Sequence, residues 1–425
     1  KMTTEQILAR RDRRHLEAVI SDDAVAAEHP PYIKLGMDSI EFQYMLERRK
    51  ALDGSIPKRT TVARRPLDLP ADGPFAEMRA GSNGQEVSTT MAFTRLLRGL
   101  ARDEHIGPRV VPIIPDEART FGMDALFREL NIYASQGQKY QPVDHDLLLS
   151  YSESTKGQIL EEGITEAGSM ASFIAAGTSY STRGVPMVPF YTFYSMFGFQ
   201  RVGDLIWQAA DMRARGFMMA ATAGRTTLLG EGLQHQDGHS LVLASTVPFV
   251  QAYDPAFAYE VGAIVQAGMN RMFGGGPPEV TDVFYYITLY NENYEMPPLQ
   301  DTPGLAEAIV EGLYKWADAP AGATIPATLL FSGTAHTAAR EAAAELAEHY
   351  DVGVELWSAT SYKSLREEAL ATERWNRLHP SQTPRVPRVA QILDGSKGPI
   401  VAAVSYTHLT LPTNTVTWRS RWSAC

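Results

Sequence analysis

One stretch of this 425-residue chain places several acidic side chains directly before a helical pattern, where a carboxyl group could take part in proton chemistry. The run Gly157 to Glu166 contains Glu161, Glu162 and Glu166, and residues 164–176 have the apolar spacing of a helix. In one interpretation, the acids interact favourably with the positive end of the helix dipole. In the other, Glu166 faces a cleft as a buried acid whose pKa is raised.

A second stretch, residues 189–199, is dominated by aromatic side chains together with a methionine. Such a run is typical of a hydrophobic core. A flat heteroaromatic ligand would also suit this wall, because offset stacking adds about 0.5–1.5 kcal/mol beyond burial.

Glycines surround two histidines in the segment 230–239, and they permit a tight loop that approaches a ligand closely. His235 and His239 are four residues apart, as zinc ligands on a helix can be. The glycines disfavour a helix here, so we expect no metal ligands. His235 is either a proton donor or charge stabiliser on a loop, or an ordinary surface histidine.

Asp116 and Glu117 follow the apolar run 110–114, which is predicted to be a strand. In α/β sheets, ligands gather at the carboxyl ends of the strands. The alternative is that Asp116 caps a helix and Arg119 pairs with an acid. For His336, which also follows a predicted strand, we expect a structural role.

The elements that position these residues alternate from about residue 85. Helices are predicted around 93–100 and at 164–176, 196–215 and 253–272, and strands at 110–114, 185–191, 216–223 and 280–290. This alternation predicts an α/β fold with a mainly parallel sheet covered on both faces. Prolines near residues 297–304 mark a boundary to a second α/β unit, with strands at 327–331, 353–357 and 399–404 and helices at 337–350 and 361–374.

The two ends of the chain have a different character. A capping box of Thr3 and Gln6 predicts a helix at the start, an amphipathic stretch follows at 41–51, and residues 56–84 suggest an extended connector. The last residues, 405–425, are rich in Thr, Ser and Trp without periodicity, and we interpret them as a tail of non-native sequence. The expected domains are therefore residues 1–75, 76–296, 297–404 and 405–425.

Composition excludes several classes of protein. With 44% hydrophobic and 21% charged residues, the chain has the profile of a globular protein. Its net charge of -10 argues against general nucleic-acid binding, and we find no apolar run of roughly 18 residues that would span a membrane. The first residues lack a signal-peptide pattern, and the one cysteine, Cys425, excludes a disulfide framework. We expect a cytoplasmic protein.

Taken together, these stretches resemble the homodimeric bacterial pyruvate dehydrogenase first component, which depends on thiamine diphosphate. The resemblance covers roughly residues 40–404 and is carried by the runs 115–123, 177–182, 194–201, 224–238 and 378–387. It implies an α/β fold in which a parallel-sheet, pyrimidine-binding middle domain precedes part of a transketolase-like C-terminal domain.

In this family, a further domain holds the cofactor's diphosphate and Mg²⁺ through a Gly-Asp-Gly motif followed by an asparagine. This sequence contains no such motif. The resemblance therefore implies a chain truncated at both ends, with weak or no thiamine diphosphate binding and no activity alone.

The resemblance also implies roles for individual residues. Glu166 matches the carboxyl group that shares a proton with the aminopyrimidine ring, Phe197 the aromatic ring that stacks on it, and Ile164 the residue that packs beside it. His235 matches the group that hydrogen-bonds the substrate or the developing enol oxygen, and Asp116 and Glu117 match active-centre acids of the family. The implied reaction is oxidative decarboxylation of pyruvate, with transfer of the acetyl unit to a lipoyl group on the dihydrolipoamide acetyltransferase partner.

Two other functions fit the same stretches. A transketolase shares the glutamate, the aromatic wall and the loop histidine, and a non-catalytic interaction module could keep the fold. The run Gln234 to His239 and the C-terminal stretch favour pyruvate dehydrogenase.

Overall fold

The computed structural model describes residues 2–27, 34–52, 54, 63, 65–116, 118–143, 145, 151–224 and 232–404. The chain divides into two compact units, residues 1–59 and 60–425, and each is considered by itself. Among the described helices, none combines the length and the apolar character that crossing a bilayer requires.

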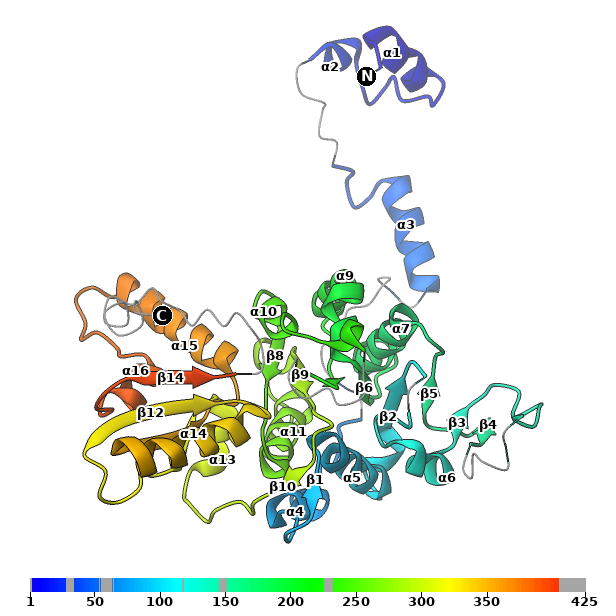
Figure 1. Ribbon diagram of the computed structural model, residues 1–425. Helices are drawn as coiled ribbons and strands as arrows, with labels where there is room; N and C mark the ends of the chain where they lie inside the picture. Colours follow the sequence, from blue (N-terminus) through cyan, green and yellow to red (C-terminus); the bar gives the residue numbers. More distant parts are fainter. Residues whose placement is uncertain are drawn as a thin grey trace. The chain divides into compact units, whose positions relative to one another are not determined.

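In the described part of the first unit there are three helices, α1 (Thr4–Asp12), α2 (Asp22–Ala26) and α3 (Ile40–Ala51) (Figure 1). The predicted capping box is present at α1, since Thr3 accepts from the backbone of Gln6 and the side chain of Gln6 accepts from Thr3. The helix predicted at 41–51 is confirmed as α3. No residue of these three helices is buried, so capping and local bonds supply most of their order.

The centre of the second unit is a six-stranded sheet in which every pairing is parallel (Figure 1). Its strands, in spatial order, are β5 (Leu160–Glu161), β2 (Val110–Ile114), β6 (Val188–Tyr194), β7 (Phe217–Ala221), β9 (Phe284–Thr288) and β8 (Val250–Tyr253). The prediction of a mainly parallel sheet is confirmed.

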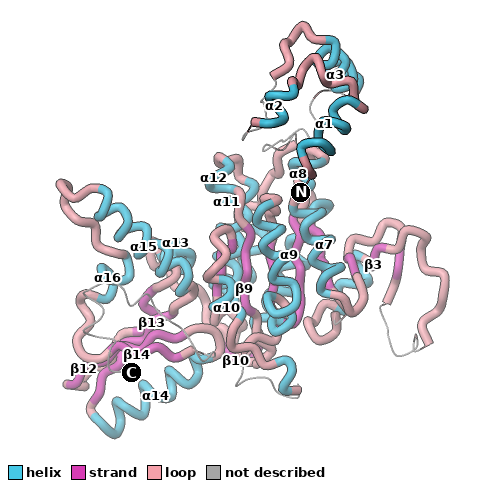
Figure 2. The backbone as a smooth tube through the Cα atoms, turned by 90° about the horizontal axis from the view of Figure 1, so that it is seen from above, coloured by secondary structure: helices cyan, strands magenta, loops and turns pink. Residues whose placement is uncertain are grey.

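Helices cover both faces of this sheet (Figure 2). On one face lie α7 (Glu166–Gly177) and α9 (Phe199–Asp211), and on the other α5 (Thr89–Arg102) and α11 (Ala258–Phe273). Side chains alternate along β7, so that Met218 packs with the first pair of helices and Phe217 with the second. Burial on both faces explains why the strands are almost continuously apolar.

A smaller mixed sheet follows, with strands β11 (Tyr314–Ala317), β13 (Val352–Ser358), β12 (Ile325–Phe331) and β14 (Ile400–Ala403) in that order. Strand β12 pairs in parallel with β13 and β14, whereas β11 is antiparallel to β13. Helices α14 (Ala335–Tyr350) and α15 (Tyr362–Leu378) accompany it, as predicted. Strand β11 was not predicted, because its four residues are too few to show a hydrophobic period. Its pairing register with β13 also shifts between Lys315 and Ala317.

Shorter elements complete the described part of the second unit. They are α4 (Gly73–Ala80), β1 (Glu86–Val87), η1 (Gly107–Arg109), η2 (Asp124–Leu126), α6 (Phe127–Leu130), β3 (Ile132–Tyr133), β4 (Glu153–Ser154), α8 (Ser179–Thr182), η3 (Ser195–Phe197), η4 (Leu233–His235), α10 (Ser240–Ala244), α12 (Pro278–Thr281), β10 (Tyr294–Glu295), α13 (Leu305–Glu311) and α16 (Arg388–Leu393).

Two predictions of element boundaries were wrong, and one strand was not predicted. The connector expected at 56–84 contains α4, because Pro74 suits the first turn of a helix and Phe75 and Met78 are buried. The helix expected within 253–272 is confirmed as α11, which begins at Ala258, whereas β8 was not predicted because it is too short to show a period. Strand β6 extends to Tyr194 and α9 begins only at Phe199, because η3 turns the chain between them.

The histidine for which we expected a structural role is buried and should make stability depend on pH. His336, in the first turn of α14, contacts the rings of Phe257, Tyr294 and Phe331, and burial lowers its pKa to about 4. Between about pH 6.5 and 4, the unfolded chain binds a proton that the folded chain does not, so stability falls as the pH drops. We expect a loss of roughly 3 kcal/mol across this window, measured by urea unfolding.

The variant His336→Asn keeps a side-chain donor for the Gly333 carbonyl but removes the titrating group. It should flatten this part of the pH profile, while His349→Asn, at an exposed position, should leave the slope unchanged. Equal slopes for the wild type and His336→Asn would show that another group controls acid sensitivity.

Candidate active site

Glu166 opens helix α7 and is buried, with 8% of its surface exposed. The helix starts here because Thr165 adopts an extended conformation and its hydroxyl accepts a hydrogen bond from the backbone of Gly168 at 3.2 Å. The position therefore combines the two features raised by the sequence, a first-turn acid and a buried carboxyl group.

The aromatic run forms a wall beside this carboxyl group. Strand β6 ends at Tyr194, and η3 then turns the chain so that the rings of Tyr194 and Phe197 meet edge to face, 5.9 Å apart. The turn requires a glycine at position 198, because a Cβ atom there would lie 2.5 Å from Cε2 of Phe193. The tight turn presents Phe197 at the carboxyl end of the sheet.

Arg201, on α9, joins the wall to the acid. Its guanidinium carbon lies 3.8 Å from the centre of the Phe197 ring, and Nη1 donates to both carboxylate oxygens of Glu166, at 3.0 and 3.1 Å. The Glu166 side chain is 10% exposed and that of Arg201 49%. Sequence reasoning on individual residues missed Arg201; its place four residues after Phe197 was the only local signal.

His235 completes the cluster. Its ring stacks on Tyr194 with centres 4.3 Å apart and meets Phe197 edge to face at 5.5 Å. Asp237 fixes the end of this loop, since its carboxylate accepts from the backbones of His239 and Ser240 at 3.0 and 3.1 Å. His235 ends η4, a single 3-10 turn, although the glycines disfavoured a helix in this segment; His239 is exposed and is not part of the cluster.

These side chains line one cavity at the carboxyl ends of β2 and β6, where ligands of α/β sheets bind. It is lined by Pro115, Asp116, Phe121, Ile164, Glu166, Tyr194, Phe197, Arg201 and His235. The fold thus brings together five of the six residues singled out from the sequence; the sixth, Glu117, lies outside the described residues. Within the described ranges, no group of three or more His, Cys, Asp or Glu side chains is placed to hold a metal ion.

A second carboxyl group near the cavity titrates close to neutrality. Glu161 lies on β5 beside the end of β2, where it pairs in register with Ile114. Burial and the nearby charge of Asp116 raise its pKa to about 7, against the opposing effect of a hydrogen bond with Tyr151. Proton exchange near neutral pH is therefore available at this side of the cavity.

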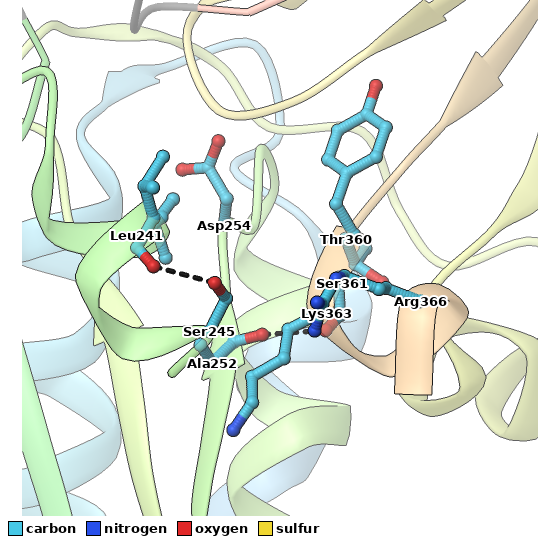
Figure 3. A pocket seen from close by; sticks show the side chains of 10 residues that line it. Leu241, Ser245, Ala252, Asp254, Thr360, Ser361, Lys363 and Arg366 are labelled. Carbon is cyan, nitrogen blue, oxygen red and sulfur yellow. Dashed lines mark hydrogen bonds between the residues drawn. The ribbon is translucent and has the colours of Figure 1, made fainter. Parts of the chain in front are cut away.

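A different cavity lies between β8, α10 and the start of α15 (Figure 3). The Ser361 hydroxyl donates to the carbonyl of Ala252 at 2.6 Å, and Asp254 accepts from the hydroxyls of Thr288 and Tyr290 at 2.5 and 2.6 Å. The Ser361 bond thus ties the start of α15 to β8, and Asp254 ties the end of β8 to the end of β9. None of the residues singled out from the sequence as site candidates lines this cavity.

Lys363, which also lines it, should contribute to stability. Its ammonium group is buried, donates to the carbonyls of Val247 (at 2.6 Å) and Val250, and pairs with Glu367; burial lowers its pKa. Lys363→Met keeps the length of the side chain but removes the donor, and should cost about 1–3 kcal/mol in thermal or urea unfolding. Lys397→Met, at an exposed position, serves as the control and should stay within about 0.5 kcal/mol of the wild type.

The chain matches a protein family over residues 67–297, which correspond to the pyruvate dehydrogenase E1 component middle domain. The pyruvate dehydrogenase E1 component of Mycobacterium tuberculosis is 50% identical over 405 residues, which are 95% of this chain and 43% of that protein. The component of Escherichia coli K12 is 45% identical over 409 residues, covering 96% of this chain and 45% of that protein. The chain thus spans less than half the length of these relatives.

Solved transketolase structures share the fold. The enzyme from Leishmania mexicana superposes with a TM-score of 0.56 at 16% identity, covering 79% of this chain and 41% of that one. The enzyme from Campylobacter jejuni gives a TM-score of 0.54 at 14% identity, with 86% and 45% covered. The match over more than half of its residues shows that the chain belongs to the pyruvate dehydrogenase E1 component family.

Proposed function

We propose that this chain forms the aminopyrimidine-binding part of a thiamine-diphosphate-dependent enzyme that decarboxylates pyruvate for the pyruvate dehydrogenase complex. One observation carries the proposal. The buried carboxylate of Glu166 and the ring face of Phe197 both contact one flat cation with N–H donors, the guanidinium group of Arg201. Family membership gives the reaction to be expected of such a site.

The residues present fit an aminopyrimidine. The guanidinium group of Arg201 is planar, carries N–H donors and is held by the face of one ring and by one carboxylate. An aminopyrimidine is likewise planar and, when protonated on its ring nitrogen, donates to a carboxylate. The way in which Arg201 is held supports the proposal that a planar, protonated ring could be bound between the same two residues.

Each residue of the cavity can be given a task. Phe197 would stack on the pyrimidine, Ile164 would pack beside it, and Glu166 would hold a proton at ring atom N1′. The bound cofactor supplies an electron sink for the carbon that loses CO₂. His235 and Asp116 line the same cavity. His235 would hydrogen-bond the substrate or the developing enol oxygen, and Asp116 and Glu117 would serve as active-centre acids.

The wider setting is also proposed. Residues 76–296 would form the pyrimidine-binding domain and 297–404 part of the C-terminal domain of a cytoplasmic homodimer. The diphosphate and Mg²⁺ would be held by another part of the enzyme. The acetyl unit would pass to a lipoyl group on dihydrolipoamide acetyltransferase, and no nucleic acid or membrane would be involved.

A chimera tests this function. In it, this chain replaces the 409 matching residues of the Escherichia coli relative, and lipoamide-coupled turnover of pyruvate is compared with ketol transfer between sugar phosphates. We expect pyruvate turnover that requires thiamine diphosphate. Ketol transfer without pyruvate turnover would favour a transketolase, and neither activity in a folded, cofactor-binding chimera would favour an interaction module.

A further inference from the structure

We propose that Arg201 competes with an aminopyrimidine for the binding position between the Phe197 ring and the Glu166 carboxylate, which we call the ring seat. The Arg201 side chain would thereby set the affinity of the chain for an aminopyrimidine. The inference rests on the proposed function, because it concerns the same seat. It goes beyond that function by assigning Arg201 a task that opposes binding.

The position of the guanidinium group carries the inference. It lies between the Phe197 ring, 3.8 Å from the ring centre, and the Glu166 carboxylate, at 3.0 and 3.1 Å from the two oxygens. These distances are those of stacking and of a charge-assisted hydrogen bond. A flat group that used the same face of Phe197 and the same side of the carboxylate would overlap with this guanidinium group.

A ring that stacks on this face of Phe197 and bonds this side of Glu166 must therefore displace Arg201. Both carboxylate oxygens already accept from the same nitrogen, and a protonated pyrimidine would also be repelled by the positive charge. The Arg201 side chain is 49% exposed, so it can move into solvent when a ligand displaces it. The side chain thus acts as a latch that closes on the seat and opens outward.

A latch of this kind lowers affinity without changing the seat itself. The apparent dissociation constant equals the intrinsic one divided by the fraction of molecules with the latch open. If the latch is closed in about nine molecules of ten, its removal tightens binding about tenfold.

The test is a titration of the full 425-residue chain with 4-amino-5-hydroxymethyl-2-methylpyrimidine, followed by NMR at millimolar concentrations. This probe carries the ring but no diphosphate, so only the seat is measured. Arg201→Met removes the charge and the donors, and Arg201→Gln provides a second variant should the first fold poorly. Arg183→Met, at an exposed arginine that does not line the cavity, is the matched control.

We expect Arg201→Met or Arg201→Gln to bind the probe about tenfold more tightly than the wild type, with Arg183→Met unchanged. Equal or weaker binding by the Arg201 variants would overturn the latch and make Arg201 a support for Glu166. Glu166→Gln separates this failure from that of the proposed function. If the wild type binds and Glu166→Gln does not, the seat stands whatever Arg201 does; if no protein binds the probe, the seat itself is refuted.

Discussion

Replacement of Glu166 by glutamine in the chimeric enzyme is expected to lower pyruvate turnover by roughly 10²–10⁴-fold. Glu166 is buried, and its carboxylate accepts a hydrogen bond from the Arg201 guanidinium group, which stacks on Phe197. No other side chain of the described cavity combines these two features. An amide has nearly the same shape but cannot exchange a proton with a ring nitrogen. The change therefore removes proton transfer and leaves packing in place.

The measurement is the steady-state rate of the lipoamide-coupled reaction at saturating pyruvate and cofactor. Glu307→Gln is the matched control, since Glu307 also lies in the first turn of a helix but is exposed. It should retain the wild-type rate. Turnover of Glu166→Gln within about threefold of the wild type would remove Glu166 from the proton path.

Replacement of Glu260 by alanine is expected to cost about 3–5 kcal/mol of stability. This carboxyl group, on α11, is fully buried and accepts from the hydroxyls of Tyr314 and Ser358, both at 2.6 Å, and from the backbones of Ala256 and Phe257 at 2.5 and 3.2 Å. It joins the central layers to the smaller sheet. Its removal leaves four buried donors without this acceptor. Burial raises the pKa of the Glu260 carboxyl group, which shows how little solvent reaches this position.

Urea unfolding of the full chain measures this loss. Glu260→Gln keeps one acceptor oxygen and should fall between the alanine variant and the wild type, and Glu345→Ala, on the exposed face of α14, should change little. A loss below about 1 kcal/mol for Glu260→Ala would mean that water or a shifted side chain satisfies the donors.

Local patterns predicted much of the fold. Strand β2 occupies the predicted residues 110–114, because an apolar run that ends at Pro115 has few other structures open to it. The helix at 164–176 is present as α7, which begins two residues later, at Glu166, and ends one residue later, at Gly177. Strand β8 escaped prediction because four residues carry too little periodicity.

The candidate site likewise contains residues that local sequence runs identify and one contact that only the packing of helices creates. Glu166, Phe197, His235, Ile164 and Asp116 could be named from their local runs and from the family resemblance, and the fold places them around one cavity. The ion pair between Glu166 and Arg201 could not be named, since it joins residues 35 positions apart and depends on how α7 packs on α9. Long-range pairs of this kind follow from packing and not from sequence spacing.

A crystal structure of the chimera with thiamine diphosphate tests the central claim most directly. We expect that the pyrimidine ring stacks on Phe197, that its N1′ atom lies within hydrogen-bond distance of a Glu166 carboxylate oxygen, and that the Arg201 guanidinium has moved aside. A cofactor ring bound elsewhere, with Glu166 still paired to Arg201, would contradict the account.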